Sequence, residues 1–216
     1  IATNRLPIML TSTSTVSAAD FDGDGDSDLF VGGRLVNGAY PTIPKSYLLQ
    51  NQGDGRFKDV TQQLAPTLSK IGMVTDAAWA DVNGDEQIDL IIVGDWMPIT
   101  IFRNEQGQFT STELDNTNGL WRSLAIADFN EDGNLDIIAG NQGINNQFKV
   151  NEAQLMGLYT ADFDENGTLD PMFVQIKDNI AYPWLYKDDI TQQLPQLKKD
   201  YLKYAAFSKA SLDDLF

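Results

Sequence analysis

The sequence contains no cysteine and no histidine. Without cysteine the fold has no disulfide, and without histidine it has neither the commonest general base nor a Ser-His-Asp or Cys-His catalytic arrangement. No apolar run reaches the roughly 18 residues that a membrane-spanning helix needs, so we expect no membrane insertion. Basic residues are also scarce, 15 against 31 acidic ones, and the net charge of −16 makes nucleic acid a poor partner because phosphates would be repelled.

More than half of the acidic residues lie in a nine-residue segment that occurs four times. In the first copy, residues 20–28, acidic side chains occupy positions 1, 3, 5, 7 and 9, and Gly25 occupies position 6. Glycine adopts positive φ without strain, so a turn at Gly25 can direct the carboxylates toward a shared centre. Converging oxygen ligands without nitrogen or sulfur favour a hard cation, and Ca²⁺ in particular.

The other copies begin at residues 81, 128 and 162 and keep the same pattern. Each has Asp at positions 1 and 9 and Asp or Asn at positions 3 and 5, whereas position 7 varies, as expected if its backbone carbonyl is the ligand. We therefore predict four structural Ca²⁺ ions, the first site the tightest. The second is predicted to be the weakest, because Glu86 replaces the glycine at position 6. The predicted metal-site residues are Asp20, Asp22, Asp24, Asp26, Asp28, Asp81, Asn83, Asp85, Gln87, Asp89, Asp128, Asn130, Asp132, Asn134, Asp136, Asp162, Asp164, Asn166, Thr168 and Asp170.

Three other interpretations compete with a metal site. Asp, Asn and Gly also cluster in ordinary hairpin turns, but four copies in one register argue against that origin. An EF-hand or dockerin needs an acidic residue at position 12, and here that position is apolar in every copy: Val31, Ile92, Ala139 and Phe173. A disulfide-bearing calcium repeat of the thrombospondin kind is excluded by the absence of cysteine.

Apolar runs before and after each loop predict short antiparallel strands, and repeats of 34 to 61 residues predict a propeller or solenoid. We predict an all-β fold, a partial β-propeller of three to four blades, each ideally a four-stranded antiparallel sheet. The predicted propeller region is 1–186, with repeats near 11–66, 70–115, 119–152 and 155–186. Residues 187–216 change to a helical period and are predicted to pack on the propeller rim or to bind a partner.

These repeats resemble the FG-GAP or VCBS repeats of calcium-binding β-propellers, a family that includes the integrin α-chain propeller, cartilage acidic protein and large exported bacterial proteins. The resemblance rests on the four loops and on residues 51–61, 94–98, 140–145 and 182–216. It implies that the calcium loops join the first two strands of each blade on one face and that ligands meet the opposite face. The implied ligand-face residues are Arg34, Tyr40, Trp96, Trp121, Asn141 and Asn145, although Trp96 and Trp121 could instead pack between blades.

Two classes of function follow. The first is a calcium-stabilised extracellular binding or adhesion module that contacts protein or polysaccharide, located outside the cell, at its surface or in the periplasm. The second is a fragment of a propeller-based enzyme, such as a polysaccharide lyase or a phospholipase. Most acidic clusters would be committed to calcium, so we expect no catalytic site in this chain. Propellers of the family close with about seven blades, so we also expect a longer parent protein or self-association through open blade edges.

Overall fold

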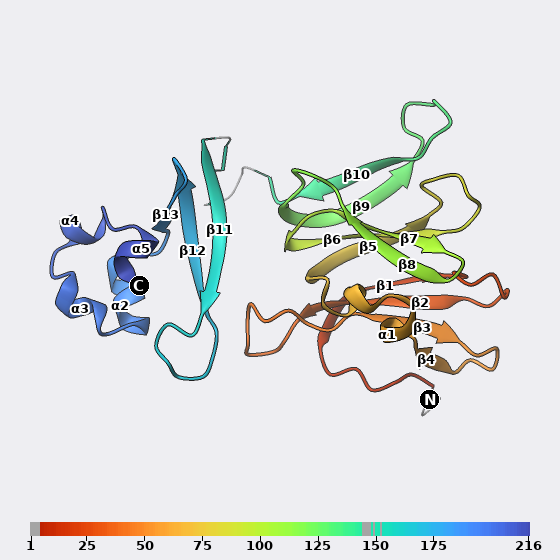
Figure 1. Ribbon diagram of the computed structural model, residues 1–216, viewed down its shortest axis with the longest axis horizontal. Helices are drawn as coiled ribbons and strands as arrows, with labels where there is room; N and C mark the ends of the chain where they lie inside the picture. The colour runs from red at the N-terminus through yellow and green to blue at the C-terminus, as the bar shows by residue number, and fades with distance from the viewer. Residues whose placement is uncertain (1–4, 144–147, 149, 152) are drawn as a thin grey trace. The chain divides into compact units, whose positions relative to one another are not determined.

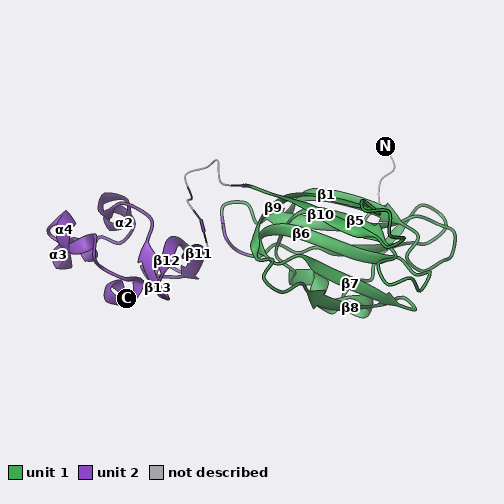
Figure 2. Cartoon of the chain, turned by 90° about the horizontal axis from the view of Figure 1, so that it is seen from above, with its two compact units in different colours: residues 1–38, 43–142 green, residues 39–42, 143–216 purple. Residues whose placement is uncertain are grey.

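The structure is a computed structural model, and it describes residues 5–143, 148, 150–151 and 153–216. The chain divides into two units (Figure 2): residues 1–38 and 43–142 form the first, and residues 39–42 and 143–216 form the second. Both are built on antiparallel sheets, and their helices are short. Among the described residues, no helix has the length and hydropathy required to span a membrane. The prediction of an all-β fold is therefore confirmed.

The first sheet contains four strands in chain order: β1 (Ser12–Ala19), β2 (Asp28–Leu35), β3 (Tyr47–Asn51) and β4 (Phe57–Asp59). All neighbouring strands are antiparallel, so the sheet is the four-stranded meander expected of a propeller blade (Figure 1, red to orange). A short helix, α1 (Thr61–Leu64), and a 3₁₀ helix, η1 (Pro66–Lys70), lead from this blade to the next.

The second sheet joins the predicted second and third blades. Its strands are β5 (Met73–Ala80), β6 (Asp89–Met97), β7 (Thr100–Glu105), β8 (Gln108–Glu113), β9 (Gly119–Ala127) and β10 (Asp136–Asn141). The third blade has one antiparallel pair, β9 and β10. Strand β9 also pairs with β6 of the second blade, a pairing that the sequence pattern does not predict. It arises because the end of β6 extends beyond its pairing with β7, so that Asp95 pairs with Leu120 and Met97 with Gly119.

Strand β6 is buried on both faces, and this places the core of the first unit on either side of it. Leu90 and Ile92 belong to a cluster that includes Phe30 and Leu48 of the first blade. Ile91 and Val93 belong to another cluster, against which residues of β9 and β10 pack. Because side chains alternate along a strand, the run Leu-Ile-Ile-Val serves two layers at once. The blades therefore stack face to face.

The second unit pairs a three-stranded sheet with short helices. The strands are β11 (Gln154–Ala161), β12 (Asp170–Lys177) and β13 (Ile180–Pro183), and the helices are α2 (Lys187–Gln193), α3 (Leu197–Asp200), α4 (Tyr204–Phe207) and α5 (Leu212–Leu215). Met172 and Val174 of β12 share one core cluster with helical residues such as Ile190 and Leu194. The helical segment thus packs on the sheet of its own unit. At its end, Ser211 caps α5: its backbone N–H donates to the Asp214 carboxylate at 2.8 Å, as in a capping box.

The same hairpin register recurs at all four acidic loops. In each, the alanine before the loop pairs with the aspartate at position 9: Ala19 with Asp28, Ala80 with Asp89, Ala127 with Asp136 and Ala161 with Asp170. The repeated unit of sequence is therefore also a repeated unit of structure, and the fold is β-propeller-like.

Candidate metal centres

The four loops share one backbone shape, defined by two residues in the left-handed region. Position 4 has φ between 59° and 77°, at Gly23, Gly84, Glu131 and Glu165. Position 6 has φ between 66° and 92°, at Gly25, Glu86, Gly133 and Gly167. Only the first loop has glycine at both positions, and each of the others places one glutamate in a conformation that L-residues adopt at a cost. Glu86 in place of glycine therefore does not distinguish the second loop from the third and fourth, because each of these loops has one glutamate at positive φ.

The aspartate at position 1 organises each loop. Its carboxylate accepts the backbone N–H groups of positions 5 and 6 in every copy. In the first loop these distances are 3.1 Å from Asp24 N to Asp20 Oδ1 and 2.9 Å from Gly25 N to Asp20 Oδ2. A carboxylate held by converging N–H groups has a fixed orientation, so it points toward the centre of the loop without help from a metal.

Positions 3 and 5 each accept the N–H two residues ahead, which curls the chain around the same centre. Asp22 accepts from Asp24, and Asp24 from Asp26, and the other three loops repeat both contacts. At position 7 the side chains make different contacts: the Gln87 amide oxygen accepts the Gln106 N–H at 2.7 Å, whereas Asn134 and Thr168 donate to the position 5 side chain of their own loops. A ligand role for the position 7 side chain is not needed, and this accounts for its variation.

The aspartate at position 9 is buried in three of the four loops. Asp28 and Asp89 are fully buried and Asp170 is 6% exposed. Each accepts the N–H of position 2 through Oδ2. The Oδ1 atoms of Asp28 and Asp89 also accept a backbone N–H from the outer hairpin of their own blade, from Asn51 at 2.7 Å and Asn104 at 2.8 Å. Asp170 instead accepts the side-chain amide of Gln193 at 2.7 Å.

Burial without a counter-charge raises the pKa of the position 9 carboxylates in the first two loops. Desolvation raises the pKa of Asp28 to about 6, although the N–H groups of Asn51 and Phe21 act in the opposite direction, and the charges of Asp22 and Asp24 add to the increase. Desolvation likewise raises the pKa of Asp89. A cation at the loop centre would offset both the burial and the mutual repulsion.

The donor set fits a hard divalent cation. In the first loop, carboxylate oxygens of Asp20, Asp22 and Asp28 lie within 4.8 Å of one another, and Asp162, Asp164 and Asp170 meet in the same way in the fourth. These are positions 1, 3 and 9. The second and third loops carry Asn83 and Asn130 at position 3, so an amide oxygen replaces one carboxylate there. Two acidic clusters could therefore hold a metal ion, and their all-oxygen ligands are compatible with calcium.

The predicted ligand-face residues of the first unit lie at the strand ends opposite the loops. Arg34 is near the end of β2, Trp96 near the end of β6, Trp121 near the start of β9 and Asn141 at the end of β10. Trp121 contributes to the core cluster beside β6, and its indole N–H donates to the Thr117 carbonyl at 2.8 Å. Tyr40 belongs to the second unit, and Asn145 lies outside the described residues.

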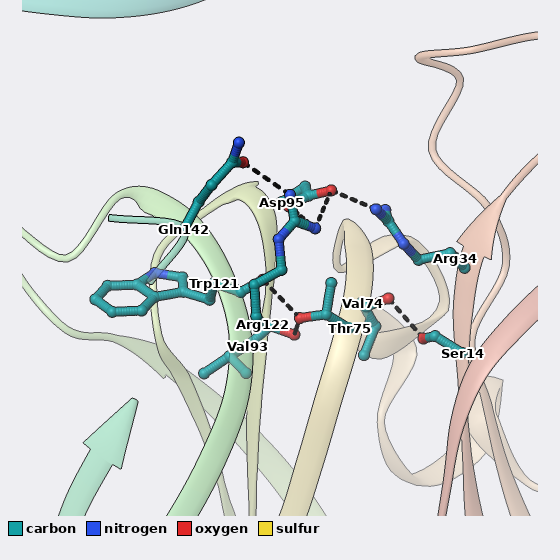
Figure 3. A network of polar contacts seen from close by, with 9 residues as sticks. All are labelled: Ser14, Arg34, Val74, Thr75, Val93, Asp95, Trp121, Arg122 and Gln142. Atoms are coloured by element: carbon teal, nitrogen blue, oxygen red, sulfur yellow. Dashed lines mark hydrogen bonds and ion pairs between the residues drawn. The ribbon is translucent and has the colours of Figure 1, made fainter. Parts of the chain in front are cut away.

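An ion-pair network at this end connects three blades through Asp95 (Figure 3). The Asp95 side chain is 9% exposed and accepts a hydrogen bond from Arg34 of β2. Arg122 of β9 lies 2.9 Å from Asp95 Oδ1 and donates to Oδ2 at 3.2 Å. Arg122 also donates to the Gln142 side chain at 2.9 Å, whereas the adjacent Trp121 ring points away from the network. One buried carboxylate thereby orients two guanidinium groups.

Pattern reasoning did not identify Asp95, Arg122 or the residues that support position 9. The sequence does mark Asn51 and Asn104 as equivalent residues, because the outer hairpins of the first two blades repeat each other in sequence. Asp95 lies within residues 94–98, which carry part of the resemblance, and it is a charged residue in a largely apolar strand, but neither feature indicates its two arginine partners. No sequence feature marks Gln193, since it is the last residue of a helix 23 positions after Asp170.

Comparison with known families supports the repeat assignment. A family model described as FG-GAP-like repeat matches the chain twice, over residues 20–92 and 81–139, and the two matches together span more than half of the sequence. The matched regions contain the first three acidic loops. No curated protein that was compared with the chain matches it.

Proposed function

The chain belongs to the FG-GAP-like repeat family, and from this premise we propose that it is a calcium-stabilised extracellular binding module, of the adhesion type, that contacts a protein or a polysaccharide. The observation that carries the proposal is the common geometry of the four loops. The same carboxylate network, built on the same two left-handed positions, recurs wherever the sequence motif occurs. In the first and fourth loops, carboxylate oxygens at positions 1, 3 and 9 lie within 4.8 Å of one another, and a cation would offset their mutual repulsion.

Four Ca²⁺ ions are proposed, one in each loop. The ligands are the side chains at positions 1, 3, 5 and 9 and the carbonyl oxygen at position 7. When bound, calcium supplies charge neutralisation and six to eight coordination positions in a flexible geometry, which a loop of mixed carboxylate and amide oxygens can provide. Mg²⁺ demands a smaller, nearly octahedral site and dehydrates reluctantly, so it is the weaker competitor. The first loop, with two glycines and five aspartates, is proposed as the tightest site.

The cell exterior or the periplasm suits such sites. Extracellular calcium modules bind with dissociation constants on the order of 10⁻⁴–10⁻³ M. Open loops of this type would be filled at those calcium concentrations and would stay empty in a calcium-poor cytosol. The acidic composition is consistent with this location, because many carboxylates are then neutralised by metal.

The ligand surface is proposed at the strand ends opposite the loops. Arg34, Trp96 and Asn141 lie there, and the Asp95 network fixes the orientation of Arg34 and Arg122. Guanidinium, amide and indole groups together suit the hydroxyl and carboxylate groups of a polysaccharide or the side chains of a protein.

Thermal melts with and without calcium test the stabilising role. A ligand that binds only the folded state adds RT ln(1 + [L]/Kd), roughly 1–3 kcal/mol per site at ten- to hundred-fold saturation. Removal of calcium by EDTA should lower the Tm by many degrees, and excess Mg²⁺ should restore little of the loss. An unchanged melting curve in EDTA would leave the loops as hairpin turns only.

No catalytic role is proposed for this chain, which has no histidine and whose clustered carboxylates are assigned to metal. Purified protein should therefore bind its target without converting it. Incubation with acidic polysaccharides and with phospholipid vesicles, followed by analysis of released products, checks this. Arg34→Ala changes the proposed ligand surface. If the wild-type chain converts one of these substrates and Arg34→Ala does not, the proposal is contradicted.

A further inference from the structure

The fourth loop differs from the first two in what supports its position 9 aspartate. In the first and second blades, the outer hairpin supplies a backbone N–H to that carboxylate, from Asn51 and Asn104. The described part of the fourth blade has three strands, β11 to β13. The Nε2 group of Gln193, at the end of α2, donates to the same atom, Asp170 Oδ1, at 2.7 Å. In the fourth blade, a helix therefore supplies the hydrogen-bond donor that the outer hairpin supplies in the first two blades.

The helix is held in this position by the core of its own unit. Ile190 and Leu194 are fully buried and share a cluster with Met172 and Val174 of β12, the strand that begins at Asp170. Gln193 thus projects its amide toward the loop from a helix whose neighbouring residues are anchored. The Phe163 N–H donates to Asp170 Oδ2 at 3.0 Å, so the two carboxylate oxygens are each fixed by one donor. Both retain a lone pair for a metal ion.

The third loop provides the contrast within the same chain. Asp136 receives the Phe129 N–H at 3.0 Å, and the described residues supply no further donor to it. It is also more exposed than Asp28, Asp89 and Asp170. Within the described residues, a second donor to position 9 is therefore found at the first, second and fourth loops. It is present where another element, a hairpin or a helix, packs beside the start of the second strand.

We propose that Gln193 is a positioning residue for metal binding at the fourth loop, and that docking of α2 and occupancy of this loop are thermodynamically coupled. The inference rests on the proposed calcium function. A donor that orients a metal-ligating carboxylate typically contributes about 10- to 100-fold to metal affinity. Coupling is reciprocal, so calcium in the fourth loop must stabilise the docked helix by the same factor.

The test is a calcium titration of the full chain followed by amide NMR. The Gly25 N–H donates to Asp20 and the Gly167 N–H donates to Asp162, so each amide reports its own loop. In Gln193→Leu, the calcium midpoint at Gly167 should rise about 10- to 100-fold, while the midpoint at Gly25 stays unchanged. Gln192→Leu is the matched control, because Gln192 is an exposed residue of the same type on the same helix, and it should change neither midpoint.

A second variant and a second readout guard against trivial loss of folding. Gln193→Met keeps the length of the side chain and removes the amide donor without changing the charge, so it should raise the calcium midpoint at Gly167 as Gln193→Leu does. Hydrogen exchange of α2 amides, such as Leu194 N–H, which donates to Ile190 O at 2.7 Å, should slow when calcium is added to the wild type, and slow less in Gln193→Leu. An unchanged Gly167 midpoint in both Gln193 variants, with a normal response at Gly25, would overturn this inference alone. The absence of any calcium response at Gly25 and Gly167 would overturn the proposed function with it.

Discussion

Arg122 and Asp95 are an ion pair across the β6–β9 junction, with Arg122 Nη1 2.9 Å from Asp95 Oδ1. Arg34 of β2 contacts the same carboxylate, so one aspartate connects three blades. Removal of one member from a buried ion pair typically costs about 3–5 kcal/mol because the remaining charge loses its partner. The side chains of Arg34 and Arg122 are 28% and 44% exposed, so water can compensate for part of the lost interaction.

We therefore expect Asp95→Ala to lower the free energy of unfolding by less than the roughly 3–5 kcal/mol of a fully buried pair, yet clearly more than a surface substitution. Asp115→Ala, in the exposed turn before β9, is the matched control and should be nearly neutral. Urea unfolding of both variants measures the difference. Equal midpoints for the two would show that the network has no role in holding the blades together.

The loop backbone leads to a second prediction. Glu86, Glu131 and Glu165 each adopt positive φ, where an L-residue is disfavoured by about 1–2 kcal/mol relative to glycine. Replacement of each by glycine should raise the free energy of unfolding by about 1 kcal/mol, since the strain is removed. Glu113→Gly, in strand β8, is the control and should destabilise the chain by up to about 1 kcal/mol. A stabilising effect confined to Glu86→Gly would contradict the common loop geometry.

The pH dependence of calcium binding follows from Asp28. Burial raises its pKa to about 6 in the metal-free loop, above the ordinary value of 3.8. Above pH 6 this buried carboxylate is ionised, which lowers the stability of the metal-free protein, and that cost disappears as the pH falls through 6 toward 4. Calcium requires the ionised form, so the stabilisation by calcium should shrink between pH 7 and pH 5. Melting curves with and without calcium at both pH values measure this, and Asp28→Asn should remove the contribution of the first loop. A calcium effect that grows on acidification would contradict the assignment.

The two tryptophans at the strand ends should differ in their effect on stability. Trp121 packs with Leu124, Ile126 and Ile137 against the β6 core, so Trp121→Ala should cost up to about 3–5 kcal/mol. Trp96 is partly exposed and belongs to none of the core clusters of the described residues, so Trp96→Ala should cost less. Thermal melts compare them directly. A collapse of both variants would place Trp96 in the packing as well, and would remove it from the proposed ligand surface.

The loops and their hairpins could be predicted because their causes are local. Five or six residues in one stretch fix each carboxylate network, and the four repeats reinforce one another. The sequence pattern does not predict positive φ at Glu131 and Glu165. The motif indicates a left-handed residue only at position 6, where both of these loops have glycine. Arg34 and Asp95 are 61 residues apart, and no periodicity relates them. Gln193 lies on a helix, whereas the corresponding donors in the first two blades lie on outer hairpins. The repeat pattern therefore does not predict that Gln193 contacts Asp170.

The number of bound metal ions tests the central claim most directly. The wild-type chain should be loaded with calcium, dialysed against a buffer that contains a weak chelator, and analysed for metal and protein by mass spectrometry of the same sample. The account predicts close to four Ca²⁺ per chain, with one ion lost in each single variant Asp20→Ala, Asp81→Ala, Asp128→Ala and Asp162→Ala, and none lost in Asp115→Ala. Fewer than two calcium ions per wild-type chain would contradict it.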